Sequence, residues 1–414
     1  MYYIPGYVLE RDIDCNNVNL QSIIHQNEIQ LGEKEIIEEY RTIKKSGTKK
    51  IESKLEKFLY EQEMLCSELE LKNINERFRK TMRSKMILTI MPTENCNFNC
   101  AYCYEKHDNT VMGKNVIEGI KKFLYSKSLE INKIDISWFG GEPTLRENIV
   151  VEISEYMKKL VEERNTIIYT GSMTTNGYLL DERRFKRFLS LGINNYQITL
   201  DGFNHDKTRP LKDGSPTLEK ILGNLRQISR LPEQYHFKII LRRNILPDDG
   251  MEWYDYLNKE FGDDKRFSIL VRTVGDFGGE SVKKMNIISE SDINKVLRAH
   301  CDYIRRLKIK LENEVVDNEE VPLSKICYAS FPNGFVFRAN GNIEKCTISL
   351  GNEKNVVGKV DSNGQVIIDE GQNMQWSGTY TDTECYRCKS FLSCNNLMCP
   401  QKNIIRNTKK VCSR

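Results

Sequence analysis

The sequence predicts an α/β protein built on a partial (β/α)6 TIM-type barrel at residues 86–310, and three observations lead to this prediction. Strand-like apolar runs alternate with amphipathic segments through the middle of the chain, which is typical of a parallel sheet with helices outside it. Residues 1–80 instead place short strands before helices, as in a winged-helix-like α+β domain. Residues 320–414 are rich in Cys, Gly and Asn, so their thin core is expected to depend on bound metal.

The N-terminal domain is predicted because its strands all precede its helices, whereas strands and helices alternate from about residue 86 onward. Its expected strands are residues 2–11, 18–26 and 28–30. Its expected helices, which carry apolar residues at i, i+3 and i+4, are residues 36–45, 49–61 and 69–80.

The barrel is predicted from six strand–helix units. The expected strands are residues 86–90, 134–139, 166–170, 196–200, 237–241 and 267–271. The expected helices are residues 116–129, 149–163, 183–191, 218–228, 253–261 and 291–307. Asp181 and Glu182 precede the third helix, where acidic side chains favour a helix N-terminus.

Composition excludes several classes of protein. The 414 residues include 62 basic and 58 acidic side chains, a net charge of +4 that does not indicate a nucleic-acid-binding protein. The basic stretches 44–50 and 77–85 are read as solvated helix faces and a linker, or as a weak docking surface for an acidic peptide. No apolar run approaches the roughly 18 residues that cross a membrane, and the first residues lack the features of a signal peptide. We therefore expect a cytoplasmic protein that contacts neither nucleic acid nor membrane.

The thirteen cysteines are not expected to form disulfides in a reducing compartment, and their distribution points to metal. Cys96, Cys100 and Cys103 form a C-x3-C-x2-C run directly after the first barrel strand. Iron–sulfur clusters and structural zinc sites usually take four protein ligands, and no fourth is evident here. The run favours a cluster with one iron open for chemistry over a structural zinc or cluster site.

Three further segments follow barrel strands, where reacting groups of parallel barrels gather. The second strand ends in Phe139-Gly-Gly-Glu-Pro143, the third runs into Thr174-Thr-Asn-Gly177, and the fourth ends in Thr199-Leu-Asp-Gly202. Successive glycines allow close approach to the backbone, so residues 140–143 are predicted to bind a charged amino group. Taken singly, the first two of these segments are also compatible with ordinary turns.

The cysteine run followed by G-G-E-P resembles the radical S-adenosylmethionine (radical SAM) superfamily over about residues 86–285. The resemblance implies that Cys96, Cys100 and Cys103 hold a 4Fe–4S cluster whose open iron is chelated by the amine and carboxylate of SAM. It implies further SAM contacts at the backbone of Tyr102, at Gly140, Gly141, Glu142 and Pro143, and at Asn176, Thr199 and Asp201.

The C-terminal cysteines resemble the SPASM extension, which carries two auxiliary iron–sulfur clusters in peptide-modifying radical SAM enzymes. By this resemblance the outer cluster is held by Cys385, Cys388, Cys394 and Cys412, and the inner one by Cys327, Cys346 and Cys399. Four residues separate Cys394 from Cys399 where the SPASM pattern has three, which weakens the assignment of Cys399. A zinc ribbon at residues 385–399 is the alternative. The segment around His205 is also similar to one in SPASM enzymes, and we expect His205 to be structural.

The resemblance implies an enzyme that uses a 5′-deoxyadenosyl radical to crosslink a ribosomally synthesised precursor peptide through a thioether, C–C or C–O bond. Residues 1–80 are similar to the small domains that bind leader peptides, although a domain that only caps the barrel is the alternative. A flavodoxin or ferredoxin is the expected electron donor. An anaerobic sulfatase maturase that forms formylglycine is the alternative enzyme, but Thr347 stands where such enzymes place an aspartate. A non-catalytic iron–sulfur electron carrier or peptide-binding scaffold is the third hypothesis.

Overall fold

The computed structural model describes residues 1–14, 17–22, 27–312, 327–377 and 399–405. The chain divides into two compact units. One contains Met1–Ser84, Val316–Gly334 and Gly371–Arg414, and the other contains Lys85–Val315 and Phe335–Glu370. Among the described residues, no helix is both long and apolar enough to cross a membrane.

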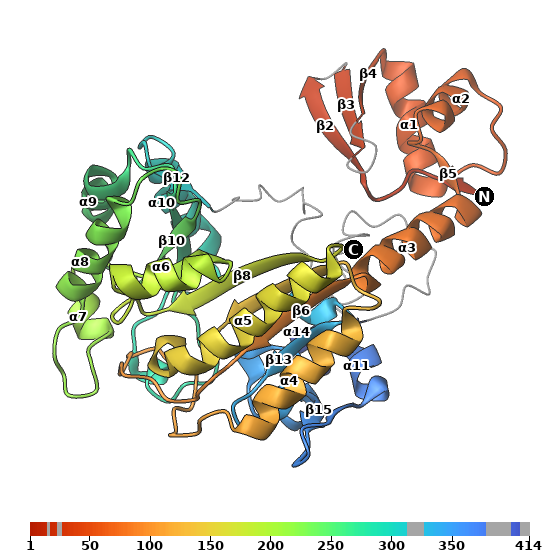
Figure 1. Ribbon diagram of the computed structural model, residues 1–414. Helices are drawn as coiled ribbons and strands as arrows, with labels where there is room; N and C mark the ends of the chain where they lie inside the picture. The colour runs from red at the N-terminus through yellow and green to blue at the C-terminus, as the bar shows by residue number, and fades with distance from the viewer. Residues whose placement is uncertain (15–16, 23–26, 313–326, 378–398, 406–414) are drawn as a thin grey trace. The chain divides into compact units, whose positions relative to one another are not determined.

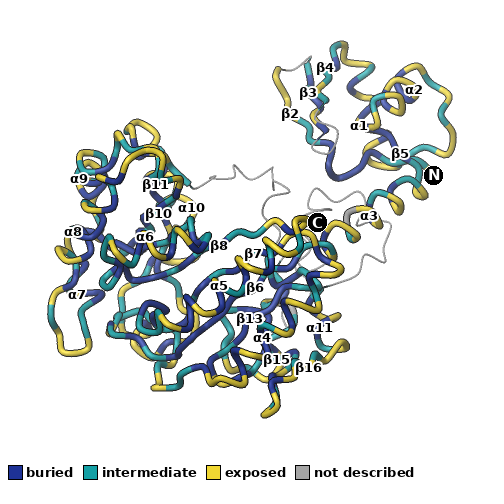
Figure 2. The backbone as a smooth tube through the Cα atoms, viewed as in Figure 1, coloured by how far each residue is buried: buried dark blue, intermediate teal, exposed yellow. Residues whose placement is uncertain are grey.

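The N-terminal residues form a small α+β structure with its own core. Strands β2 (Val8–Asp14), β3 (Asn17–Ser22) and β4 (Glu28–Gly32) make an antiparallel sheet in that order, followed by helices α1 (Lys34–Ser46), α2 (Lys54–Glu61) and α3 (Glu68–Arg83). Leu20, Tyr40 and Leu59 belong to its buried core. Figure 2 colours buried stretches of the chain dark blue.

Two N-terminal predictions need correction. The expected strand over residues 2–11 is interrupted at Pro5-Gly6, and its first part, β1 (Tyr2–Tyr3), pairs instead with β5 (Cys66–Ser67). Proline interrupts a strand because it has no N–H to donate. The expected helix over 49–61 begins only at Lys54, because Ser53 and Glu56 form a capping box that fixes the helix start.

All six predicted barrel strands are present, and they pair in chain order as a parallel sheet. They are β6 (Lys85–Ile90), β7 (Lys133–Trp138), β8 (Ile168–Thr175), β9 (Ile193–Thr199), β10 (Lys238–Ile245) and β11 (Phe267–Thr273). The helices of the repeats are α4 (Lys114–Lys127), α5 (Glu147–Arg164), α6 (Glu182–Ser190), α8 (Leu218–Ser229), α9 (Glu252–Phe261) and α10 (Ile293–Ile304). The described strands form an open sheet, which agrees with a partial barrel (Figure 1).

The sheet continues beyond its first strand into the C-terminal part of the chain. Next to β6 lie β13 (Gly334–Phe337), β14 (Asn342–Glu344), β15 (Val356–Val360) and β16 (Val366–Ile368), in that order. These four strands form an antiparallel meander, whose first turn contains Gly341 at a φ of 88°. Glycine suits this turn because its backbone adopts positive φ without a steric cost. The short strand β12 (Lys310–Leu311) pairs with β11 at the opposite end.

Candidate active site

The cysteine run lies in a loop that follows β6 and is anchored on two sides. The carbonyl oxygen of Asn95 accepts the amide N–H of Glu142 at 2.9 Å, which joins the loop to the segment after β7. The amide N–H groups of Asn99 and Ala101 bond the carbonyls of Pro210 and Thr208, at 2.9 and 2.8 Å, in the segment after β9. The run is therefore held between the ends of two parallel strands.

A cavity of about 170 Å³ opens at these strand ends, and Cys96, Cys100 and Cys103 all line it. The structure brings most of the predicted site residues to its wall: Tyr102, Gly140, Gly141, Glu142, Asn176 and Thr199. Pro143 is buried and begins a short 3-10 helix, Pro143–Arg146, directly after this wall. Asp201 is buried too, and its carboxylate accepts a hydrogen bond from the Tyr102 hydroxyl.

The three thiols influence one another electrostatically. Burial raises the pKa of Cys96 and Cys103 to about 12. Burial also raises the pKa of Cys100, although the nearby Arg209 guanidinium opposes this rise. Thiols in this state bind metal only by releasing their protons. Three cysteines on the wall of one cavity, with no fourth lining it among the described residues, fit a 4Fe–4S cluster that keeps one iron open.

The glycines after β7 are required by the packing of the cysteine loop. Gly140 has a φ of 99°, and a Cβ placed there would lie 2.7 Å from the carbonyl oxygen of Thr93. A Cβ at Gly141 would collide with the carbonyl group of Asn95. These glycines therefore let the backbone before Cys96 lie directly against the segment after β7, in addition to leaving backbone atoms at the cavity wall.

The Glu142 carboxylate organises this end of the sheet from a buried position. One oxygen accepts hydrogen bonds from the hydroxyls of Thr144 and Thr175, at 2.6 and 2.7 Å, and from the Thr144 amide. The other accepts the backbone N–H of Asn176 at 2.7 Å. Burial raises the pKa of Glu142, and these hydrogen bonds oppose the rise. Glu142 thereby links the ends of β7 and β8, and Asn176 in turn donates to Asn97 in the cysteine loop.

A second buried cluster surrounds Tyr102, and sequence reasoning identified only part of it. The Tyr102 hydroxyl donates to Asp201 at 2.5 Å and accepts from Arg209 and Asn244, at 3.0 and 2.9 Å. Arg209 and Asn244 also line the cavity. The segment that ends at Arg209 was singled out for His205, whose buried ring accepts the amide N–H of Asp201 at 3.2 Å. Asn244 gave no sequence signal, because it lies in the continuation of β10 beyond the expected strand end.

Two further residues of the cysteine loop were missed. Glu105 lines the cavity, and burial together with the nearby Glu94 carboxylate raises its pKa to about 8. Among the described residues its Oε2 atom has no hydrogen-bond partner. His107 places Nε2 3.2 Å from the sulfur of Cys103 and Nδ1 3.1 Å from the carbonyl oxygen of Glu94. His107 gave no sequence signal, because it stands outside every motif of the sequence.

The C-terminal cysteines are described only in part. Cys346 is buried directly after β14, and its backbone N–H donates to Asn355 at 2.9 Å. Cys327 and Cys399 lie in the other compact unit, each at the start of a short helix. The remaining predicted ligands lie outside the described residues: Cys385, Cys388, Cys394 and Cys412.

Comparison with known proteins agrees with this geometry. Residues 90–240 match the family model of the Radical SAM superfamily. This part of the chain is therefore a radical SAM domain, of a superfamily whose members are enzymes and which implies a 4Fe–4S cluster and SAM. The match runs from the last residue of β6 to the start of β10 and contains all three cysteines of the run together with the segments after β7, β8 and β9.

Among curated proteins, the chain is 28% identical over 173 residues to a GTP 3′,8-cyclase of Aliarcobacter butzleri, covering 41% of this chain and 50% of that protein. It is 30% identical over 154 residues to a probable GTP 3′,8-cyclase of Methanococcus aeolicus, covering 36% and 46%. The chain thus spans about half the length of the curated relatives it matches.

Among solved structures, native anSMEcpe with bound AdoMet superposes with a TM-score of 0.53 at 20% identity, covering 75% of this chain and 88% of that one. SuiB of Streptococcus suis bound to its precursor peptide SuiA gives the same TM-score at 14% identity, covering 96% and 95%. At these identities the likeness shows a shared fold.

Proposed function

We propose that the protein is a radical SAM maturase that crosslinks a ribosomally synthesised precursor peptide. The observation that carries this proposal is one cavity at the ends of parallel strands whose wall contains the three cysteines together with Gly140, Gly141 and Glu142. The fold that it shares with SuiB over nearly the whole chain supports a peptide substrate, because SuiB is crystallised with a precursor peptide.

In this proposal Cys96, Cys100 and Cys103 hold the cluster, and SAM lies against residues 140–143, Tyr102, Asn176 and Thr199. Held by these residues, the cluster and SAM would supply the radical chemistry that removes hydrogen from an unactivated carbon of the substrate. The residues of the chain bind, orient and exclude water. Asp201 holds Tyr102 in place, since its carboxylate accepts a hydrogen bond from the Tyr102 hydroxyl with 2.5 Å between the two oxygens.

The auxiliary clusters remain part of the proposal. Cys327, Cys346 and Cys399 are assigned to an inner cluster, and Cys385, Cys388, Cys394 and Cys412 to an outer one. The buried position of Cys346, directly after a strand of the main sheet, supports a ligand role there. An inner cluster with an open iron would bind a substrate thiolate and favour a thioether product. Electrons for the reaction come from a donor such as flavodoxin or ferredoxin.

The N-terminal sheet is proposed to bind the leader part of the peptide. Strands β2 and β4 are the edges of the three-stranded sheet, and a peptide strand that pairs with such an edge gains main-chain hydrogen bonds. The N-terminal residues form a buried core of their own, with members from Ile4 to Leu71, which supports a recognition module.

Other functions are weaker on the present observations. The likeness to the GTP 3′,8-cyclase of Aliarcobacter butzleri covers 41% of this chain and half of that protein. Sulfatase maturation lacks the expected aspartate, because Thr347 follows Cys346 at the start of a 3-10 helix. An electron carrier would leave the wall formed by Gly140, Gly141 and Glu142 without a ligand.

Anaerobic co-expression with candidate cysteine-containing precursor peptides, followed by mass spectrometry, tests the proposal. We expect each crosslink to remove two hydrogens, a loss of about 2 Da, and to disappear with Cys100→Ala. Conversion of a sulfatase peptide to formylglycine instead, or of GTP to a cyclised product, would replace the proposed function.

A further inference from the structure

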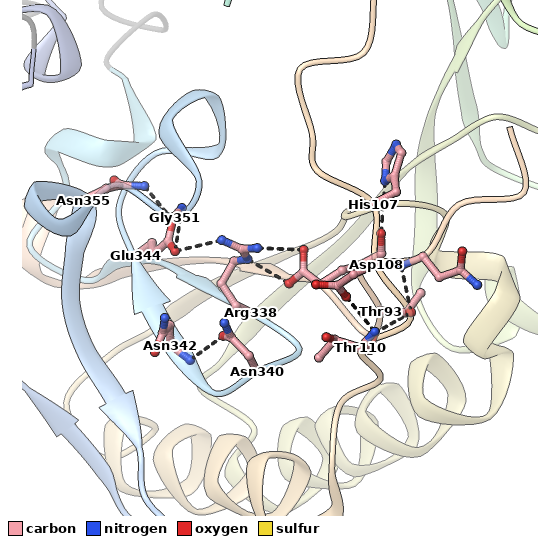
Figure 3. Close-up of polar contacts among 12 residues, drawn as sticks. Thr93, His107, Asp108, Thr110, Arg338, Asn340, Asn342, Glu344, Gly351 and Asn355 are labelled. Carbon is pink, nitrogen blue, oxygen red and sulfur yellow. Dashed lines mark hydrogen bonds and ion pairs between the residues drawn. The ribbon is translucent and has the colours of Figure 1, made fainter. Parts of the chain in front are cut away.

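A buried ionic network joins the cysteine loop to the strands that extend the sheet. Its central residue is Arg338, just after β13 (Figure 3). The Arg338 Nε and Nη2 atoms lie 2.8 and 2.9 Å from the two carboxylate oxygens of Glu94. Its Nη1 atom lies 3.0 Å from Glu344. The side chains of Glu94, Arg338 and Glu344 are 4%, 12% and 0% exposed, so water screens these contacts little.

One end of the network fixes the cysteine loop. Glu94 precedes Cys96 by two residues, and its amide N–H donates to the carbonyl of Thr110 at 3.0 Å. Its own carbonyl accepts from His107 Nδ1, and the other ring nitrogen of His107 lies 3.2 Å from the Cys103 sulfur. Through Glu94, Arg338 therefore acts on both the beginning and the end of the loop that carries the three cysteines.

The other end of the network reaches Cys346. The Glu344 carboxylate accepts the side-chain amide of Asn355 at 2.7 Å and also accepts the Gly351 N–H. Asn355 in turn accepts the backbone N–H of Cys346 at 2.9 Å and donates to its carbonyl at 2.8 Å. A continuous path of hydrogen bonds thus joins the backbone of Cys346 to the side chain of Cys103.

We propose that Arg338 is a positioning residue that couples the geometry of the first cysteine site to that of Cys346. The planar guanidinium bonds both oxygens of Glu94 while it holds Glu344, an arrangement that a lysine ammonium cannot reproduce. A change at the Glu344 end is thereby transmitted to the cysteine loop, although Glu344 is not part of the cavity wall. The inference rests on the proposed function in one respect, since it takes the first site to hold a SAM-binding cluster.

The test uses the full chain after anaerobic reconstitution with iron and sulfide. Arg338→Lys keeps the positive charge but loses the bidentate contact with the Glu94 carboxylate. Glu344→Gln keeps the shape of that side chain but removes its negative charge, at the other end of the network. The readouts are the change that SAM causes in the EPR spectrum of the reduced protein, and the SAM dissociation constant. The first readout reports only the cluster that contacts SAM.

We expect both variants to alter the SAM-dependent spectrum and to raise the SAM dissociation constant about fivefold or more, as is typical of coupled sites. Lys121→Met is the matched control, because it removes the two ion pairs that Lys121 of α4 makes with Glu118 and Glu152 in the same unit. The control is expected to leave both readouts unchanged.

The inference is overturned if Arg338→Lys and Glu344→Gln lower the melting temperature but leave both readouts at their wild-type values. The network would then only stabilise the fold, and the proposed function would stand. A wild-type protein whose spectrum does not respond to SAM would overturn the proposed function, and this inference with it.

Discussion

At the scale of single residues, the site depends on how closely two backbone segments approach at Gly141. The carbonyl of Asn95 lies where a Cβ on residue 141 would collide with it, and the same carbonyl oxygen accepts a hydrogen bond from the Glu142 amide. Side chains such as Tyr102 and Arg209 then pack around a loop whose path is already set by these contacts.

Gly141→Ala is therefore expected to displace the cysteine loop. The added methyl group meets backbone atoms that cannot rotate away, so we expect a loss of about 1–3 kcal/mol in the free energy of unfolding and lower iron content after reconstitution. Gly223→Ala is the control: it lies in α8 with open space around it, and alanine there should stabilise the helix by about 0.5–1 kcal/mol. Equal stability and iron content in Gly141→Ala and the wild type would contradict this account.

His205 gives the fold a defined dependence on pH. Burial, with the Arg209 guanidinium nearby, lowers its pKa from 6.5 to about 4. Between these values the unfolded chain binds the proton and the folded chain does not, so stability falls as pH drops from about 6.5 to 4, by on the order of 3 kcal/mol.

The variant His205→Asn is expected to lose less stability between pH 7 and pH 5 than the wild type, as measured by urea unfolding. His236→Asn, at an exposed position, should keep the wild-type dependence. If the free energy of unfolding of His205→Asn and of the wild type depends on pH in the same way, His205 is not a buried neutral imidazole.

The sequence was sufficient to single out the three cysteines and part of the cavity wall, because these residues occur in short motifs directly after strands. It was not sufficient for Arg338 or Asn244. Their partners Glu94 and Tyr102 lie more than a hundred residues away along the chain, and only the folded sheet brings them together.

At the scale of elements, helix and strand starts follow local capping, while strand ends depend on tertiary pairing. Asp181 was predicted to begin the third barrel helix, and its carboxylate accepts the Arg184 N–H at 2.8 Å at the start of α6. By contrast β8 continues to Thr175, five residues beyond the expected end. Its last five residues, Gly-Ser-Met-Thr-Thr, contain a single large apolar side chain, Met173, and pairing with β7 and β9 keeps them extended.

Asp181→Ala is expected to lower the free energy of unfolding by about 1 kcal/mol, because the first turn of α6 loses its cap and a favourable charge. Chemical denaturation measures this directly. Asp248→Ala, an exposed position in the loop after β10, should change stability little. If both substitutions have the same effect, Asp181 does not act as a cap.

At the scale of the whole molecule, the chain combines a radical SAM domain with an N-terminal α+β structure and a C-terminal meander that extends the same sheet. The extension of the sheet by β13–β16 was not predicted, because the short strands of this region lack periodicity of their own. It brings Cys346 into the same compact unit as the first cysteine run.

The proposed function, with one SAM-binding and two auxiliary four-iron clusters, requires about 12 iron atoms per reconstituted chain. Replacement of Cys96, Cys100 and Cys103 together by alanine should remove about four of them and leave the others in place. Iron and zinc are both measured by elemental analysis. Zinc bound in stoichiometric amounts to the wild type would support a zinc ribbon in place of the outer cluster.

The most direct measurement of the central claim is reductive cleavage of SAM by the reconstituted protein. We expect the wild type to release 5′-deoxyadenosine and methionine in equal amounts when it is reduced, and Cys100→Ala to release neither. Cys301→Ala, which removes a buried thiol in α10 away from the cavity, should retain cleavage. Release of 5′-deoxyadenosine by Cys100→Ala at the wild-type rate, or its absence from the fully iron-loaded wild type, would contradict the account.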